Sequence, residues 1–260
     1  MELPTTPSFS LENKRALVTG ASRGIGLAAA VALADAGAHV TLAARTLDDL
    51  EAAAEAIRER CSANAGKGTA DVLELDVANP ESIESAIASL PALDILVNNA
   101  GIARHSAMVD TDMDDFDAVM NINLRGAFHI AKLVVSGMLA DGRKGSIITT
   151  SSQMGHVGGV DRSVYCASKF AVEGWTRALA IEVGKSGIRV NTICPTFIAT
   201  PLTKQTLSNP ERMAWIMSKI KLDRIGEVED IMGPVVFLAS DASALITGTS
   251  LLIDGGWTAG

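Results

Sequence analysis

The amino-acid sequence predicts an α/β fold, a single domain in which helices cover both faces of a doubly wound, mostly parallel sheet of seven strands. Short runs rich in β-branched residues alternate along the chain with longer alanine-rich runs of helical periodicity. Strands that alternate with helices are joined by right-handed crossovers and lie parallel. The strand runs are almost continuously apolar, which is typical of strands buried on both faces. No linker, repeat or shift in composition divides the 260 residues.

Local sequence features justify the individual elements. The first strand, RALVT, leads into a glycine-rich turn, and the helix that follows it ends at Gly37. The third helix is entered through Pro80, and proline is favoured in the first turn of a helix. The expected strands are Arg15–Thr19, His39–Ala43, Ala70–Leu75, Asp94–Val97, Ser146–Thr150, Arg189–Ile193 and Ser250–Ile253. The expected helices are Gly24–Ala36, Leu47–Arg60, Glu81–Leu90, Asp114–Leu139 with a break near Asn121–Gly126, Ser163–Val183 and Asp230–Ala239.

Two segments are expected to stand apart from the packed domain, which spans residues 13–260. Residues 1–12 contain two prolines and no apolar core, so we expect a flexible arm. Residues 196–226 are longer than a connector needs to be and contain Pro201 and Pro210. Ligands of doubly wound sheets bind at the carboxyl ends of the strands, so this segment is expected to be a substrate lid. Its Trp215 either covers an apolar substrate or belongs to a small core of the lid.

Composition argues against several classes of protein. The chain has 22 basic and 30 acidic residues and a formal net charge of −8, which does not suit a protein that coats nucleic acid. Cys61, Cys166 and Cys194 form no CxxC pair, so we expect reduced, mostly buried thiols in a cytoplasmic protein. The N-terminus lacks the apolar core of a signal peptide. The most membrane-like stretch, Leu27–Ala44, is interrupted by polar residues and a turn, so no membrane association is expected.

A glycine-rich turn follows the first strand, with the sequence TGASRGIG at residues 19–26. Gly20 suits a tight turn, Gly24 lets the backbone approach a pyrophosphate, and Gly26 permits close packing of helix and strand. The helix N-terminus offers unpaired N–H groups and a partial positive charge to phosphates. Because the turn lies between a strand and a helix, it predicts a dinucleotide-binding site.

The end of the second strand indicates which dinucleotide is bound. A site for NAD normally carries an acidic side chain here that accepts a hydrogen bond from the ribose 2′-OH. This chain instead has Ala44 followed by Arg45, and an arginine binds a 2′-phosphate through charged hydrogen bonds. Arg23 in the glycine turn adds a second positive charge. We therefore expect NADP as the cofactor. NAD is the alternative, in which Arg45 is only a solvent-exposed residue at the start of a helix.

Four polar residues form a candidate catalytic set. Tyr165, the only tyrosine, and Lys169 are four residues apart on an expected helix and therefore share a face. A nearby ammonium group and the positive nicotinamide ring of an oxidised cofactor together favour the phenolate and lower the pKa of a tyrosine, which suits it to proton exchange near neutral pH. Ser152, just past the fifth strand, is placed to hold a substrate oxygen opposite Tyr165. Asn123 is a mediocre helix former, so we expect it to bend its helix and to hold a water that links Lys169 to solvent.

The TGxxxGxG spacing, the sequence NNAG at residues 98–101 and this set of four residues together resemble the short-chain dehydrogenase/reductase family. The resemblance extends over nearly the whole chain, from Lys14 to Gly256, and the pattern is most similar to 3-oxoacyl-thioester reductases and related alcohol dehydrogenases. It implies the Rossmann form of the doubly wound fold and a catalytic tetrad of Asn123, Ser152, Tyr165 and Lys169. It also implies a homotetramer built on the helices 114–139 and 163–183, with a second contact near the C-terminal strand.

The resemblance also assigns a cofactor site. Asp76 would accept a hydrogen bond from the adenine amino group, and the alternative is a carboxylate that only serves the entry to a helix. The expected cofactor-binding residues are Gly20, Ser22, Arg23, Gly24, Ile25, Gly26, Arg45, Asp76, Val77, Asn98, Tyr165, Lys169, Ile198 and Thr200. One position departs from the family pattern: Thr196 stands where glycine is usual after the sixth strand. A left-handed backbone at this β-branched residue would be strained, so the loop is expected to sit differently.

The expected substrate-binding residues are Ser152, Met154, His156 and Tyr165. His156 is more simply explained as a polar loop residue, because the tetrad already supplies proton transfer. The aspartates of residues 110–117 lie at a helix start, where capping and the helix dipole explain them, so we assign no metal site.

The expected function is the transfer of hydride between C4 of a nicotinamide cofactor and a carbonyl or secondary-alcohol substrate. One alternative is an NAD-linked sugar or polyol dehydrogenase with the same tetrad. Another is a regulator that senses the cofactor without turnover, although a sensor has no need of a proton relay.

Overall fold

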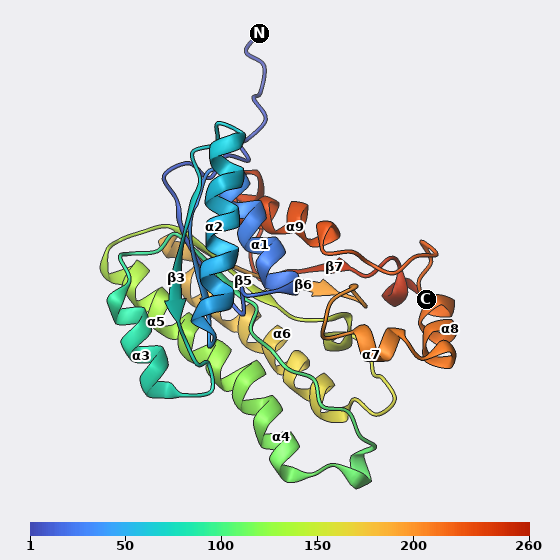
Figure 1. Cartoon of the computed structure of the whole chain (residues 1–260). Helices are drawn as coiled ribbons and strands as arrows, with labels where there is room; N and C mark the ends of the chain where they lie inside the picture. Colours follow the sequence, from blue (N-terminus) through green and yellow to red (C-terminus); the bar gives the residue numbers. More distant parts are fainter.

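A seven-stranded parallel sheet forms the centre of the computed structural model, which describes all residues from Met1 to Gly260 (Figure 1). The strands pair in the order β3-β2-β1-β4-β5-β6-β7, and every pairing is parallel. The predicted fold class is therefore confirmed, with no antiparallel strand in the sheet. The strands are β1 (Arg15–Thr19), β2 (His39–Ala44), β3 (Thr69–Glu74), β4 (Ile95–Asn98), β5 (Gly145–Thr150), β6 (Ile188–Pro195) and β7 (Ser250–Ile253).

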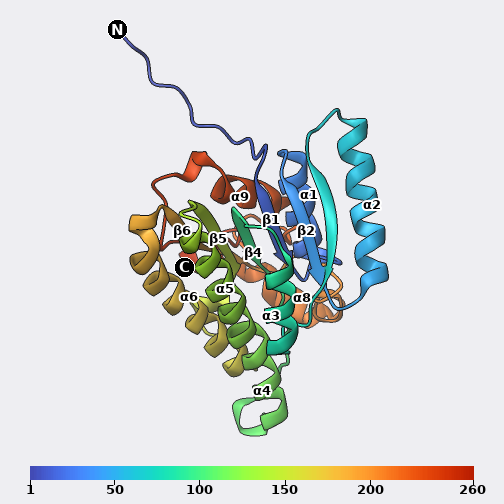
Figure 2. The ribbon, with the colours of Figure 1, turned by 90° about the vertical axis from the view of Figure 1, so that its left-hand side faces the viewer.

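Helices cover both faces of the sheet, and each face has its own apolar core (Figure 2). One face carries α1 (Gly24–Asp35), α2 (Leu47–Ala63) and α9 (Glu229–Ala239), whose buried side chains include Leu33, Leu50 and Val235. The other face carries α3 (Pro80–Ser89), α5 (Ala127–Ala140) and α6 (Ser163–Val183). The remaining α-helices are α4 (Met113–Met120), α7 (Lys204–Leu207) and α8 (Pro210–Lys219). No helix is long and apolar enough to cross a membrane.

The order of the strands reverses beside β1. The chain runs outward from β1 through β2 to β3 and then returns to β4 on the other side of β1. The loops that follow β1 and β4 therefore diverge at the carboxyl edge of the sheet, where doubly wound proteins bind their ligands. Helices α7 and α8, from the segment that we expect to be a lid, lie at the same edge in Figure 1.

The N-terminal arm is shorter than the expected residues 1–12, because residues 11 and 12 contact the packed domain. Residues 1–10 are exposed, but Leu11 is only 1% exposed, and its N–H donates a 2.8 Å hydrogen bond to the carbonyl of Ala36. The carboxylate of Glu12 pairs with Lys67 at 2.7 Å. Residues 11 and 12 are thus part of the packed domain. The side chain of Leu11 belongs to the apolar core, and a single apolar residue is too short a pattern for the sequence to have indicated this.

The expected break in the long central helix is present. A π-helical segment, η2 (Asn121–Gly126), separates α4 from α5. Asp112 caps α4 by accepting a hydrogen bond from the N–H of Asp114, so the aspartates there do serve a helix start.

The segment that we expect to be a lid packs on a small core that it shares with Met154 and Trp257. Trp215 of α8 contacts Trp257 with ring centroids 5.2 Å apart, and Trp257 contacts Phe197 at 5.8 Å. Ile216 is fully buried beneath them. Of the two readings of Trp215, its contacts favour a lid core. Thr196 does not adopt a positive φ, so it avoids the strain of a left-handed backbone. The strand continues to Pro195, and the N–H of Thr196 donates a hydrogen bond to the carbonyl of Ile253.

Candidate active site

The glycine turn between β1 and α1 forms a tight backbone cradle. Gly20 and Gly24 have φ angles of +64° and +59°, which favour glycine. A Cβ on Gly26 would collide with the carbonyl oxygen of Gly20 and with the amide of Asn99. Ser22 and Ile25 lie half-buried in the turn, and a Cβ on Gly24 would touch Thr200 at the start of the lid. The turn therefore has the form that an approaching pyrophosphate needs.

Side chains from β1 and β4 hold this cradle in place. The hydroxyl of Thr19 accepts hydrogen bonds from the N–H groups of Asn99 and Ala100, each at 3.0 Å. The Asn99 amide donates to the carbonyls of Thr19 and Gly20 at 3.0 and 3.3 Å. Asn98 instead points into the core and donates to the Ala127 carbonyl at 2.6 Å. Its side chain braces α5, so any cofactor contact from Asn98 would come from its backbone.

The residues expected near the adenosine have free polar groups. Arg23 and Arg45 are exposed and make no ion pair within the chain. One carboxylate oxygen of Asp76 accepts a hydrogen bond from Ala78 at 2.9 Å. The helix-entry role suggested as an alternative for Asp76 is filled by Asn79, whose side chain caps α3.

Asn123 lies in the π-helical segment and is almost fully buried. Its amide donates to the carbonyl of Ile102 at 2.9 Å and accepts from the Ile102 N–H at 2.8 Å, and it donates to Ser168 of α6 at 3.3 Å. It thereby ties the loop after β4 to the helix that carries Tyr165. The expected water link from Asn123 to Lys169 stays a prediction.

Tyr165 and Lys169 share one face of α6, as their spacing predicts. The ammonium of Lys169 lies 5.6 Å from the centre of the Tyr165 ring and donates to the carbonyl of Thr150 at 2.8 Å. Burial lowers the pKa of Lys169 to about 8. Burial also raises the pKa of Tyr165, against the opposing effects of the Ser152 hydroxyl and the Arg162 charge. In the protein without cofactor, desolvation thus outweighs the neighbouring charges. The lowered tyrosine pKa that we expect when the oxidised cofactor is bound stays a prediction.

Ser152 is buried at the end of β5, where its side chain caps the short helix η3 (Gln153–Gly155). Its hydroxyl accepts from the N–H of Met154 at 3.1 Å and donates to the amide oxygen of Gln153 at 2.7 Å. Sequence reasoning did not single out Gln153, although a buried amide beside Ser152 is well suited to orient the hydroxyl of this candidate catalytic residue. The structure thus brings Ser152, Tyr165 and Lys169 to one edge of the sheet.

Two residues that the sequence analysis did not select lie beside Tyr165. The ring of His105 contacts the Tyr165 ring edge-on at 6.1 Å, and Arg162 lies 2.6 Å from Nε2 of His105. Burial lowers the pKa of His105 to about 4, helped by the charges of Arg162 and Arg212. His105 is therefore neutral at pH 7 and accepts a hydrogen bond from Arg162. The guanidinium of Arg162 also lies over the ring of Phe197 at 5.3 Å and has no carboxylate partner.

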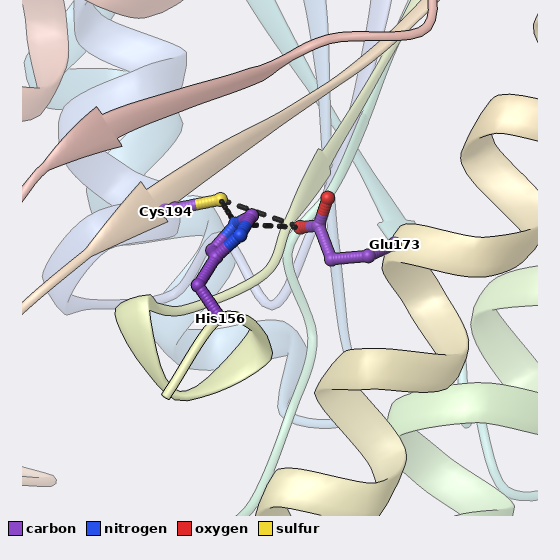
Figure 3. Close-up of side chains that lie close together, drawn as sticks. All are labelled: His156, Glu173 and Cys194. Atoms are coloured by element: carbon purple, nitrogen blue, oxygen red, sulfur yellow. Dashed lines mark hydrogen bonds and ion pairs between the residues drawn. The ribbon is translucent and has the colours of Figure 1, made fainter. Parts of the chain in front are cut away.

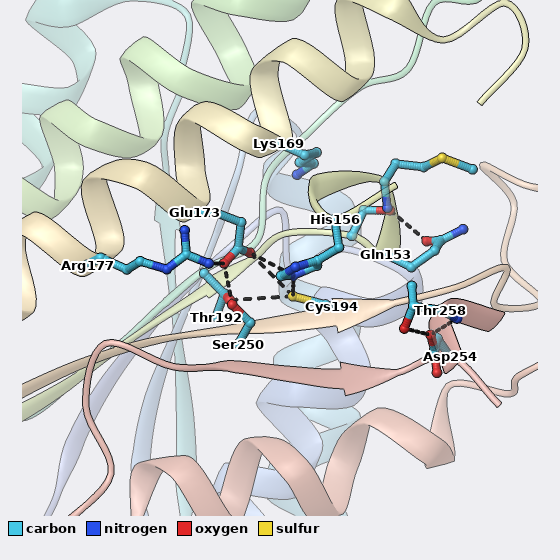
Figure 4. Close-up of polar contacts among 12 residues, drawn as sticks. Gln153, His156, Lys169, Glu173, Arg177, Thr192, Cys194, Ser250, Asp254 and Thr258 are labelled. Atoms are coloured by element: carbon cyan, nitrogen blue, oxygen red, sulfur yellow. Dashed lines mark hydrogen bonds and ion pairs between the residues drawn. The ribbon is translucent and has the colours of Figure 1, made fainter. Parts of the chain in front are cut away.

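The two other expected substrate contacts follow Ser152. Met154 is buried in the small core that also contains Ile216 and Trp257. His156 lies at the end of η3 and turns toward Glu173 of α6 and Cys194 of β6 (Figures 3 and 4). Glu173 is 2% exposed and accepts a hydrogen bond from Ser250, so it is a buried carboxylate that the sequence analysis missed. Burial raises the pKa of the Cys194 thiol to about 12.

Known proteins match this chain over almost its full length. A family model described as enoyl-(acyl carrier protein) reductase matches residues 20–258. D-erythrulose reductase of Gallus gallus is 37% identical over 96% of this chain and 98% of its own. The chain belongs to the short-chain dehydrogenase/reductase family. As a member, it is an NAD(P)-dependent oxidoreductase that acts on alcohol or carbonyl substrates.

Other short-chain dehydrogenase/reductase members that match include enzymes named for sugar acids. The 2-dehydro-3-deoxy-D-gluconate 5-dehydrogenase of Escherichia coli is 37% identical over 97% of this chain and 98% of its own. A gluconate 5-dehydrogenase of Burkholderia cenocepacia, crystallised with NADP and tartrate, has a TM-score of 0.89 and 34% identity, and the match covers 97% of this chain and 98% of that one. The glycine cradle and the exposed Arg23 and Arg45 fit the dinucleotide that this family uses.

Proposed function

We propose that this enzyme interconverts a ketone and a secondary alcohol on a small polyhydroxylated acid, with NADP(H) as its cofactor. The observation that supports this substrate class is the guanidinium of Arg162, which lies near Tyr165, bonds to the neutral His105 and has no carboxylate partner. A partly buried cation without a counter-ion is costly, and a substrate carboxylate would supply that counter-ion through charged hydrogen bonds. The same cation makes the mouth of the site a poor environment for an acyl chain.

The residues of the site divide the chemistry among them. The cofactor, when bound, supplies or accepts the hydride. The hydroxyl of Ser152 holds the substrate oxygen, oriented by the amide of Gln153. The phenol of Tyr165 gives a proton to that oxygen or takes one from it. Lys169 adds a positive charge next to the tyrosine ring, and this charge favours the phenolate that forms in the oxidative direction.

The cofactor preference is supported by the residues at the ends of β1 and β2. The half-buried Ala44 leaves no acid to accept the ribose 2′-OH, and Arg23 and Arg45 are both free of ion pairs. Replacing Ala44 with aspartate would place a carboxylate near the 2′-phosphate. We expect Ala44→Asp to lose about 1.5–3 kcal/mol of NADPH binding, the value of a hydrogen bond to a charged group, and to gain on NADH. A wild-type enzyme with the higher kcat/KM for NADH would contradict this assignment.

A paired substrate screen tests the carboxylate proposal. Initial rates would be measured for gluconate-type sugar acids and for uncharged polyols and ketoses of equal chain length. We expect the acids to have the higher kcat/KM, and Arg162→Gln to raise KM for the acids about 10–150-fold, equivalent to about 1.5–3 kcal/mol. Arg60→Gln serves as the control, because Arg60 of α2 pairs with Asp35 of α1, and these helices cover the opposite face of the sheet from α6, which carries Tyr165.

Equal rates for acids and uncharged sugars, or equal losses for both in Arg162→Gln, would overturn the carboxylate proposal. They would favour an uncharged ketose or polyol, the substrate type for which D-erythrulose reductase is named. The tetrad and the cofactor assignment would stand in that case.

We also propose a homotetramer in the cytoplasm. Phe128 on α5 and Phe170 and Ile181 on α6 are exposed apolar side chains on neighbouring helices. The small residues Ala167 and Ala178 of α6 are exposed as well, which favours close packing of two copies. The three cysteines are free thiols, which supports a reducing compartment.

A further inference from the structure

A cluster of potential metal ligands lies beneath the loop that carries Ser152. It consists of His156 at the end of η3, Glu173 on α6 and Cys194 on β6 (Figure 3). Cys194 is fully buried, Glu173 is 2% exposed, and the His156 side chain is 24% exposed. None of the three is needed for the proton exchange that we assign to Tyr165 and Ser152.

The three donor atoms have the spacing of a zinc site. Sγ of Cys194 lies 3.3 Å from Oε1 of Glu173 and 3.5 Å from Nε2 of His156, and the latter two atoms are 3.8 Å apart. From these separations, one point lies about 2.1 Å from all three atoms. Bonds of zinc to nitrogen and oxygen are about 2.0–2.2 Å and those to sulfur about 2.3 Å, so only Cys194 would need to shift slightly.

The charge of the cluster also suits a divalent cation. A thiolate and a carboxylate together neutralise Zn²⁺, which avoids a net charge in a buried place. Thiolate, imidazole and carboxylate are the ligands that zinc takes in proteins. On binding, a Zn–S bond would replace the S–H bond of Cys194, and the proton would leave to solvent. The exposed side of His156 provides a path for the ion and for a water as fourth ligand.

Neighbouring side chains hold Glu173 in place, as hydrogen-bonding neighbours of the ligands do in metal sites (Figure 4). Ser250 donates a hydrogen bond to Oε2 of Glu173, and Arg177 lies 3.8 Å from the same oxygen, so Oε1 is left facing Cys194 and His156. The buried hydroxyl of Ser151 lies beside the Cys194 thiol, where a hydrogen bond from it favours the thiolate that would bind the metal.

We propose that His156, Glu173 and Cys194 form a zinc-binding site that fastens the loop of the catalytic serine to α6 and β6. Ser152 caps η3, and His156 follows directly after that short helix, so a bond from zinc to His156 would limit movement of Ser152. The site is structural in this proposal and takes no part in hydride or proton transfer. It extends beyond the proposed function and does not depend on the identity of the substrate.

Metal content and a cobalt spectrum test the proposal. Protein without a histidine tag would be stripped with a chelator, mixed with excess ZnSO₄ or CoCl₂, desalted and analysed for bound metal. We expect one zinc per chain and, with cobalt, the intense near-ultraviolet charge-transfer band of a thiolate ligand. Cys194→Ser should lose that band, and Glu173→Gln and His156→Asn should each weaken metal binding at least tenfold.

The other two cysteines provide matched controls. Cys61 lies on α2 and Cys166 lies on α6 next to Tyr165, so Cys61→Ser and Cys166→Ser should retain the metal and the cobalt band. Wild-type protein without bound metal or without the thiolate band would overturn the proposal, as would equal binding by His156→Asn. Because His156 is partly exposed, His156→Asn keeps the test decisive if a variant of a buried ligand does not fold. Activity assays are not used here, so the substrate proposal can fail independently.

Discussion

Lys169 is a charged side chain in a place where charge is costly. It is 5% exposed, and burial lowers its pKa to about 8, from about 10.4 in an unfolded chain. The folded protein therefore binds fewer protons than the unfolded chain between these two pH values, so its stability rises with pH in that window. Below pH 8 both states are protonated, and the full destabilisation is present.

Lys169→Met should therefore stabilise the cofactor-free protein while removing its activity. From the two pKa values we expect the free energy of unfolding at pH 7 to rise by up to about 3 kcal/mol, less the lost hydrogen bond to Thr150. The advantage should shrink between pH 8 and pH 10, because only the wild type gains stability there. Urea unfolding at pH 7 and pH 9.5 measures this. Parallel pH profiles for the two proteins would show that Lys169 is not destabilising.

The proximity of two side chains was predictable where both lie on one element. Tyr165 and Lys169 are four residues apart on one helix, so their spacing alone predicted that they lie close together. Glu173 and Cys194 were not predictable, because they come from α6 and β6 and meet only when the sheet is assembled. Burial raises the pKa of Tyr165 in the cofactor-free protein. The sequence did not reveal this effect, because charges are visible in a sequence and the degree of burial of a side chain is not.

The turn between β1 and α1 can form only because Gly26 has no side chain. Gly26 packs against the carbonyl of Gly20 and the amide of Asn99 with no room for a Cβ. The same amide holds the cradle by bonding to two carbonyls. A residue larger than glycine would push the helix start away from β4.

Gly26→Ala should thus lower the melting temperature and weaken NADPH binding, because the clash displaces the cradle. Gly137→Ala is the matched control, since Gly137 lies on the exposed side of α5 and a Cβ there would meet nothing. In a helix this control should be neutral or stabilising by about 0.5–1 kcal/mol. Thermal unfolding with and without NADPH distinguishes the two variants. Equal behaviour of Gly26→Ala and Gly137→Ala would contradict the close-packing argument.

The bounds of most elements were predicted to within two residues. For buried strands and amphipathic helices, the hydrophobic periodicity and the glycine, proline and capping residues at the ends indicate the same bounds. The lid was expected only as a long segment, yet it contains α7 and α8. A signal for α8 is present: Asn209 caps it and Pro210 opens its first turn. The two prolines of this segment, Pro201 and Pro210, masked this signal. Strand β6 runs two residues past its expected end because β7 pairs with it as far as Pro195.

The whole molecule presents an apolar face on α5 and α6 that a single chain leaves exposed. Ile181 is 83% exposed, so its side chain contributes little to the stability of one protomer. Ile181→Arg should therefore fold normally but reduce assembly, if this face packs against another copy. Light scattering of the wild type should give about four times the chain mass of 27.0 kDa, and the variant should give less. A wild type that is monomeric at micromolar concentration would contradict the homotetramer.

The central claim is that proton exchange at Tyr165 drives turnover, and Tyr165→Phe tests it most directly. The substitution keeps the ring that packs beside His105 but removes the only phenol in the chain. With one true substrate, kcat should fall by at least about 10²–10⁴-fold, the usual contribution of a general acid or base. NADPH affinity, measured by fluorescence titration, should remain nearly unchanged. A Tyr165→Phe variant that keeps near-wild-type turnover would contradict the account.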